Sequence, residues 1–250
     1  MKEQLASGWH TIAPRPDDPH GPLSPLLLLL TVVTGLVDAF SYLELGRVFV
    51  ANMTGNVVFL AFALGGASGF VWWASLSAVI TFVVGALLGG RIAHRWAAHR
   101  GRHLLLGSAF QAILVIAALV VTIVLAPPAS GQSYAGVPLG VLVVLLGVAM
   151  GLQNATARAL AVPDLTTTVL TLTLTGISAD SAAGGGTNSH FGRRALSILT
   201  MFLGGLFGAL LVVKGHGRWT LLIAVVLLLI VVVSALRVSS STAAWATIDP

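Results

Sequence analysis

Two short polar runs interrupt a chain that is otherwise strongly apolar. Residues 52–56 read Asn-Met-Thr-Gly-Asn, and residues 164–171 read Asp-Leu-Thr-Thr-Thr-Val-Leu-Thr. Asparagine and threonine cap helix starts well, and the free N–H groups of a first helical turn can bind an anion or a polar solute. We therefore predict that the two runs begin two short helices whose ends meet in one polar site inside a membrane.

A single acidic residue, Asp38, lies deep in an apolar stretch. A carboxylate there is costly unless it is paired, protonated or open to water. Two interpretations stay open: Asp38 relays a proton or cation or contacts a solute, or it is a buried acid that hydrogen-bonds the backbone or nearby asparagines. For each single threonine, hydrogen bonding between helices is the competing interpretation. The predicted solute-binding residues are Asp38, Asn52, Thr54, Gly55, Asn56, Asn154, Thr166, Thr167, Thr168 and Thr171.

The composition places the chain in a lipid bilayer, which is its first expected partner. Hydrophobic residues make up 56% and charged residues only 8%, and the mean hydropathy is +0.96. A soluble domain carries about 25% charged residues. The net charge of +5 does not indicate a nucleic-acid partner, because four arginines and no acid lie at residues 91–103. Such a short basic loop between apolar spans is typical of the cytoplasmic side of a membrane, and it places this loop in the cytoplasm.

The lengths of the apolar stretches predict an all-α fold, a polytopic transmembrane bundle of about six full spans. Two further helices are short, and we expect them to be broken or re-entrant: residues 165–179 reach only ~22 Å, against a hydrocarbon core of ~30 Å. The predicted full spans are 26–43, 70–90, 104–126, 139–157, 195–213 and 221–236. The remaining segments are a disordered polar tail at 1–24, an extracytoplasmic loop at 127–138 and a C-terminal tail at 238–250.

An internal repeat relates the predicted membrane halves 25–126 and 139–237. Gly-x-x-Asp-Ala at residues 35–39 corresponds to Gly-x-x-Asn-Ala at residues 151–155, and Thr54 corresponds to Thr171. If the short helices cross the membrane, the repeats are parallel; if they re-enter, the repeats are inverted. Two Gly-x-x-x-Gly pairs also correspond and predict close helix packing or a homodimer face: Gly85, Gly89, Gly204 and Gly208.

Motifs for enzymatic chemistry are missing from the sequence. It contains no cysteine, and it has no phosphate-binding glycine loop and no zinc-protease histidine pair. We therefore expect no enzyme activity, no cofactor and no metal.

Three segments give the chain a family resemblance. They are Gly-x-x-Asp-Ala at 35–39, Val-Phe-Val-Ala-Asn-Met-Thr-Gly-Asn at 48–56, and Val-Pro-Asp-Leu-Thr-Thr-Thr-Val-Leu-Thr at 162–171. Together they resemble the YoaK-like bacterial inner-membrane proteins, a family of unknown function, over residues 25–237. The resemblance implies an inner-membrane location and supplies no substrate.

Two hypotheses for function follow from these observations. The first is a secondary transporter or channel-like protein for an ion or for a small polar or anionic solute, with the polar runs lining its central site. The alternative is a non-transporting accessory or lipid-interacting membrane protein, in which the same residues hold helices together. A water-filled cavity that reaches both runs favours the first, and a dry centre favours the second.

Overall fold

A computed structural model of the chain describes residues 8–15, 17–96, 99–125, 132–168, 170–181, 185–186 and 190–247. Over these residues the regular structure is entirely helical, which confirms the predicted fold class. Six helices are long and apolar enough to span a membrane, as predicted. They are α2 (Leu23–Glu44), α4 (Trp72–Trp96), α5 (Arg100–Val124), α6 (Gly136–Leu160), α8 (Phe191–Val213) and α9 (Gly217–Val238).

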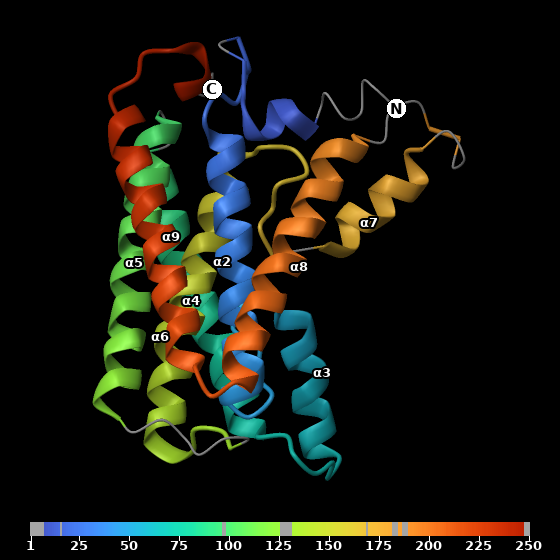
Figure 1. The fold of residues 1–250 in the computed structure, drawn as a ribbon, viewed down its shortest axis with the longest axis vertical. Coiled ribbons are helices and arrows are strands. Elements are labelled where there is room, and N and C mark those ends of the chain that lie inside the picture. The colour runs from blue at the N-terminus through green and yellow to red at the C-terminus, as the bar shows by residue number, and fades with distance from the viewer. Residues whose placement is uncertain are drawn as a thin grey trace.

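Two shorter apolar helices, α3 (Met53–Leu64) and α7 (Leu170–Ala179), complete the membrane part. In Figure 1, α2 runs from the upper to the lower end of the bundle, and α3 begins near mid-height and runs back to the lower end. The second half does the opposite: α6 runs upward, and α7 begins near mid-height and returns to the upper end. The segment before each short helix leads from one end of the bundle to mid-height, and the short helix then returns to that same end.

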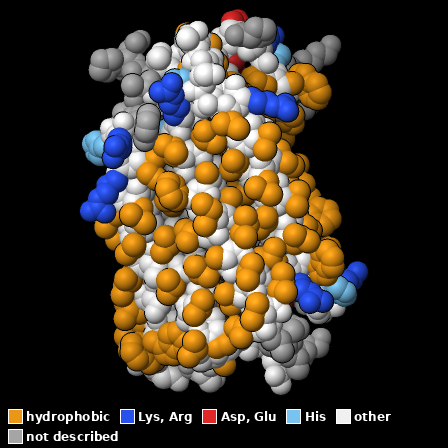
Figure 2. All heavy atoms as spheres, turned by 90° about the vertical axis from the view of Figure 1, so that its left-hand side faces the viewer, with side chains coloured by type: hydrophobic (Ala, Val, Ile, Leu, Met, Phe, Trp, Pro, Cys, Tyr) orange, Lys and Arg blue, Asp and Glu red, His pale blue; other side chains and the backbone are white. Residues whose placement is uncertain are grey.

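The outer surface of the bundle suits a bilayer. Figure 2 shows hydrophobic side chains over the middle of one face, with Lys and Arg side chains toward its two ends. Large apolar side chains on the long helices are exposed on this surface: Ile123 is 60%, Phe202 61% and Val213 76% exposed. Such a surface is stable against lipid and would aggregate in water.

The most extensive helix contacts join the two halves of the chain. They are the pairs α4 with α6 and α2 with α8, and α5 and α9 also pack together. The helix before each short helix therefore packs against the helix that follows the other short helix. This exchange makes the halves interdependent, because neither half buries its own first span.

Glycines permit the closest approaches at both exchanged pairs. A side chain at Gly85 would overlap the carbonyl oxygen of Val148, and one at Gly204 would overlap that of Val32. Such small-residue contacts let the backbones of membrane helices pack closely. Of the two predicted roles of the glycine pairs, the structure shows close packing within the chain and gives no support to a homodimer face. The buried glycines are Gly85, Gly89, Gly204 and Gly208.

The upper end is closed by both tails. Residues 8–12 form a short helical turn, and the 3₁₀ turn η2 (Ala244–Ala246) lies near the C-terminus. The guanidinium of Arg100 donates to the carbonyl oxygens of Pro19 and Trp245, each at 3.4 Å. Residues 1–7 and 16 of the predicted disordered tail at 1–24, and residues 127–131 of the predicted loop at 127–138, lie outside the described residues.

Candidate functional site

The chain reaches the start of α3 through an extended segment that follows a tight turn. Gly46 and Arg47 both have positive φ and reverse the chain after α2. The side chain of Asn52 then caps α3, accepting a hydrogen bond from Gly55 N at 3.3 Å. Asn56 is fully buried and bonds Phe49 twice, accepting from its N–H at 3.0 Å and donating to its carbonyl at 2.6 Å. Asn56 therefore satisfies the backbone of the extended segment.

Asp38 holds the same segment from α2. Its Oδ1 accepts hydrogen bonds from the backbone N–H groups of Val50 at 3.2 Å and Ala51 at 2.9 Å. The side chain is only 8% exposed, so without these bonds two backbone donors would be left unpaired away from water. Both bonds go to Oδ1, and Oδ2 has no protein donor among the described residues. One oxygen of Asp38 is structural, and the other is available to a proton, cation or solute.

The second half builds a matching arrangement with different side chains. Before α7 the backbone turns at Asp164 and Thr167, which both have positive φ. Asn154, on α6, donates from Nδ2 to Thr168 Oγ1 at 2.6 Å. A polar residue on a long helix thus holds the approach to the short helix in each half: Asp38 before α3, and Asn154 before α7.

A buried amide network ties the second approach to the rest of the bundle. Gln153 donates to Thr34 Oγ1 at 2.8 Å and to Thr167 Oγ1 at 3.2 Å. Gln111, on α5, donates in turn to Gln153 Oε1. Sequence reasoning missed both glutamines. Their signal was the one that drew attention to Asp38, a polar side chain within an apolar span.

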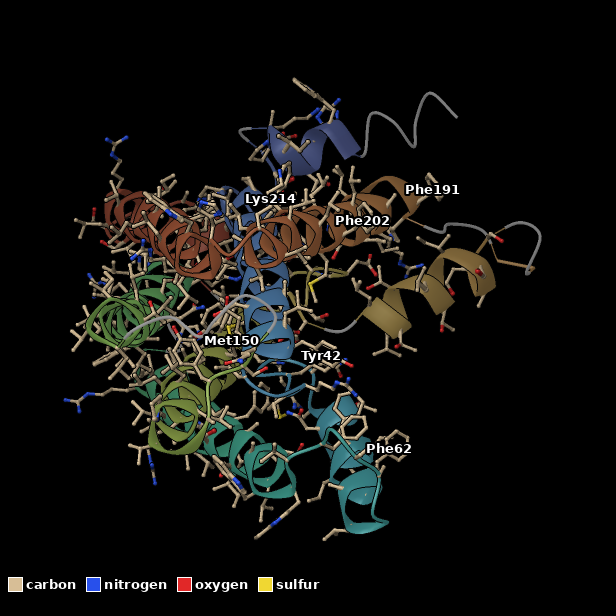
Figure 3. All side chains as sticks on the ribbon, turned by 60° about the horizontal axis from the view of Figure 1, so that its bottom comes forward. Tyr42, Phe62, Met150, Phe191, Phe202 and Lys214 are labelled. Atoms are coloured by element: carbon tan, nitrogen blue, oxygen red, sulfur yellow. The ribbon has the colours of Figure 1, made fainter. Side chains whose placement is uncertain are left out.

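A cavity of about 600 Å³ lies where the two short helices begin. Figure 3, which brings the lower end forward, shows α3 and α7 standing off on one side of the long helices, with Tyr42 between α2 and α3. The cavity walls come from both halves. The lining residues are Asp38, Ala51, Asn52, Met53, Thr54, Gly55, Val58, Phe59, Phe82, Asn154, Thr168, Leu170, Thr171 and Met201.

The structure brings together most, but not all, of the predicted binding residues. Three lie outside the cavity lining: Asn56 is used by the extended segment, Thr167 is buried against Gln153, and Thr166 is exposed. The residues brought together at the cavity are Asp38, Asn52, Thr54, Gly55, Asn154, Thr168 and Thr171.

The cavity combines one carboxylate with two helix starts. The first-turn N–H groups of α3 and α7 carry partial positive charge and can accept a negatively polarised group of a solute. Hydroxyl and amide side chains around them can donate or accept. Among the described residues that line the cavity, Asp38 is the one with a formal charge. The arrangement suits a small polar solute held by hydrogen bonds, with Asp38 setting the charge of the site.

Comparison with known proteins places the chain in a family. The family model described as "Protein of unknown function (DUF1275)" matches residues 26–234. The chain belongs to this family. It is also 34% identical, over 156 residues, to the UPF0700 transmembrane protein YoaK of Bacillus subtilis (strain 168). That alignment covers 62% of this chain and 65% of the relative, so the chain spans somewhat less than two thirds of YoaK. No solved structure matches.

The DUF1275 match confirms the YoaK-like resemblance and spans both short helices and both polar approaches. The family description names no activity, and the name of YoaK describes that relative only as a transmembrane protein.

The two short helices of this DUF1275 protein are anchored differently. Aromatic rings surround α3: the ring centroids of Phe49 and Phe59 are 5.8 Å apart, and those of Phe59 and Phe70 are 5.3 Å apart. Ion pairs hold α7 instead. Arg194 bonds Asp164, which precedes α7, and Asp180, which follows it, both at 2.8 Å. Arg194 therefore clamps both ends of α7 onto α8.

Removing the clamp should free α7. We expect Arg194→Gln to speed proteolytic cleavage near Asp180 by about tenfold, because a partly buried charge-assisted pair is worth ~1.5–3 kcal/mol. Limited proteolysis of detergent-purified protein measures this rate. Arg193→Gln is the matched control, since Arg193 takes part in no ion pair among the described residues. Equal cleavage of the two variants would show that the ion pairs do not hold α7.

Proposed function

We propose that this protein is a secondary transporter that carries a small polar or anionic solute through the cavity at the starts of α3 and α7. The observation that carries the proposal is that two short helices, which return to opposite ends of the bundle, begin at one cavity to which both contribute polar residues. Discontinuous helices that meet near mid-depth are the usual substrate sites of transporters built from inverted repeats.

Correspondence between the halves supports an inverted repeat. Ten of the fourteen lining residues form five pairs at the separations of 116 to 119 residues found in the sequence. A solute between such pairs meets similar walls from either half, which suits rocking of one half against the other. The pairs are Asp38 with Asn154, Ala51 with Thr168, Met53 with Leu170, Thr54 with Thr171, and Phe82 with Met201.

The charges support a bacterial inner-membrane orientation with residues 91–103 in the cytoplasm. Nine of the twelve described Lys and Arg residues belong to the upper end of the bundle, where α4 ends and α5 begins. The positive-inside rule assigns that end to the cytoplasm. These residues are Arg15, Arg91, Arg95, Arg100, Arg102, Arg158, Arg193, Arg194 and Arg237.

Water access to the cavity tests the proposal directly. The sequence has no cysteine, so a single introduced cysteine is the only thiol that a reagent can label. In detergent-purified protein, where both ends of the bundle are accessible, we expect Thr54→Cys and Thr171→Cys to react with a charged thiol reagent, because only a hydrated thiol forms the reactive thiolate. Ala118→Cys, at a fully buried position, should stay unlabelled, and Ser240→Cys, at an exposed position, should label fully.

The same variants can identify the solute. A panel of small anions and neutral polar solutes is added during labelling of Thr54→Cys, and the transported solute should slow its reaction without affecting Ser240→Cys. If both cavity cysteines stay unlabelled while Ser240→Cys reacts, the cavity is dry. The accessory or lipid-interacting role then replaces transport.

A further inference from the structure

A second cavity, of about 610 Å³, lies between α4, α5 and α6 at the upper end of the bundle. Two arginines and two histidines line it, and none of the described lining residues is Asp or Glu. None of these basic residues belongs to the central site. The basic residues of this basic cavity are His94, Arg100, His103 and Arg158.

His103 is a buried side chain of the basic cavity whose hydrogen-bonding capacity is not fully satisfied by the described residues. It is 3% exposed and lines the basic cavity, and neither ring nitrogen makes a hydrogen bond of ordinary geometry among the described residues. The backbone of Thr156 lies near the ring. The backbone of Thr156 can serve at most one ring nitrogen, so at least one nitrogen of this buried imidazole has no partner among the described residues. Such a nitrogen costs free energy unless a bound group completes it.

Arg100 and Arg158 give the basic cavity its charge in different ways. Arg100 is 8% exposed and is fixed in place, since it donates to the carbonyl oxygens of Leu160, Pro19 and Trp245. Its Nε has no hydrogen-bond partner in the part of the chain that the structure describes. Arg158 is exposed and makes no ion pair among the described residues. One cation is therefore rigid and the other is free to close on a ligand.

The field at this end of the bundle is positive enough to act on a neighbouring group. His20, which lies against Arg100 at 3.4 Å, has a pKa below its ordinary value. Burial is the main cause, and the charges of Arg100 and then Arg193 add to it. Positive charges that disfavour a protonated imidazole would stabilise an anion in the basic cavity.

We propose that the basic cavity is a binding site for an oxyanion, a phosphate or carboxylate group, held by Arg158 and by an N–H of His103. A guanidinium binds such groups through two parallel hydrogen bonds, and an imidazole N–H adds a directed donor. The site does not depend on transport. It adjoins the central cavity, because Phe82 and Asn154 line both, so an anion bound here stands beside the candidate solute site.

The oxyanion has two sources, a free anion or a lipid headgroup, and one experiment separates them. The melting temperature of the full chain in neutral detergent is measured against inorganic phosphate at constant ionic strength. It is measured again against short-chain phosphatidylglycerol, with phosphatidylcholine of equal chain length as the reference. We expect stabilisation that saturates with phosphate, or stabilisation by phosphatidylglycerol alone if a headgroup is the ligand.

Variants assign the effect to the basic cavity. Arg158→Gln should raise the apparent Kd at least about tenfold, because one charged bidentate contact is lost. His103→Gln should weaken binding less. Arg237→Gln, an exposed arginine at the same end and outside the basic cavity, should leave the Kd unchanged. The inference is overturned if neither probe stabilises the protein, or if Arg158→Gln and Arg237→Gln respond alike.

Discussion

We expect Gly85→Ala to abolish recovery of folded protein. The new Cβ would overlap the carbonyl oxygen of Val148 and lie 2.9 Å from its Cα. Both atoms are backbone, so no rotamer change relieves the overlap, and α4 must move away from α6. This pair is one of the two most extensive contacts in the bundle. The cost should reach or exceed the ~1–3 kcal/mol typical of overpacking.

The measurement is the monodisperse fraction after detergent extraction, followed by the melting temperature of what is recovered. Gly90→Ala is the matched control on the same helix, because, outside its own helical backbone, no described atom lies within 4 Å of its Cβ position. It should be neutral or stabilising, since alanine favours a helix by ~1 kcal/mol over glycine. Comparable recovery of Gly85→Ala and Gly90→Ala would contradict the α4–α6 contact.

The other exchanged pair should behave in the same way. Gly204→Ala would place its Cβ on the carbonyl oxygen of Val32 and 3.2 Å from the Cα of Gly35. We expect recovery to fall as for Gly85→Ala, because α8 must separate from α2. The same extraction assay measures it. A large loss at Gly85 with none at Gly204 would show that only one of the two contacts is essential.

Sequence reasoning reached the architecture because membrane burial leaves strong signals. Span lengths predicted six long helices, and the short reach of residues 165–179 favoured a broken or re-entrant helix over a full crossing. The polar runs at 52–56 and 164–171 were expected to meet, and the structure brings both to one cavity. These features depend on local composition, which a single sequence displays.

What sequence reasoning could not supply is the partner of each helix and each polar atom. The glycine pairs predicted close packing, but their spacing is the same whether the partner is another copy or another helix of the same chain. Asn56 resembled a ligand because its type suits one, yet it satisfies the backbone of Phe49 seven residues earlier. Gln153 reaches Thr34, which lies 119 residues away in the sequence. Such contacts depend on how the helices of the two halves pack against each other, which local composition does not specify.

Asp38 remains the most informative residue, because its two oxygens have different roles. Asp38→Asn keeps an oxygen that can accept from Val50 and Ala51, and it removes the charge. The second half already places an amide, Asn154, at the corresponding position. We therefore expect Asp38→Asn to melt near the wild-type temperature. Solute protection of a cysteine at Thr54 should need ~10- to 100-fold more solute, the value of one hydrogen bond to a charged group.

Asp38→Ala separates the structural role from this functional one. It removes the acceptor as well as the charge, so two buried backbone N–H groups lose their partner, at about 1–3 kcal/mol each. We expect a clear fall in melting temperature together with the loss of solute protection. If both variants melt like the wild type and protect equally well, Asp38 has neither role. If Asp38→Asn keeps full protection while Asp38→Ala unfolds, the carboxylate only supports the extended segment, and the solute is bound by the starts of α3 and α7.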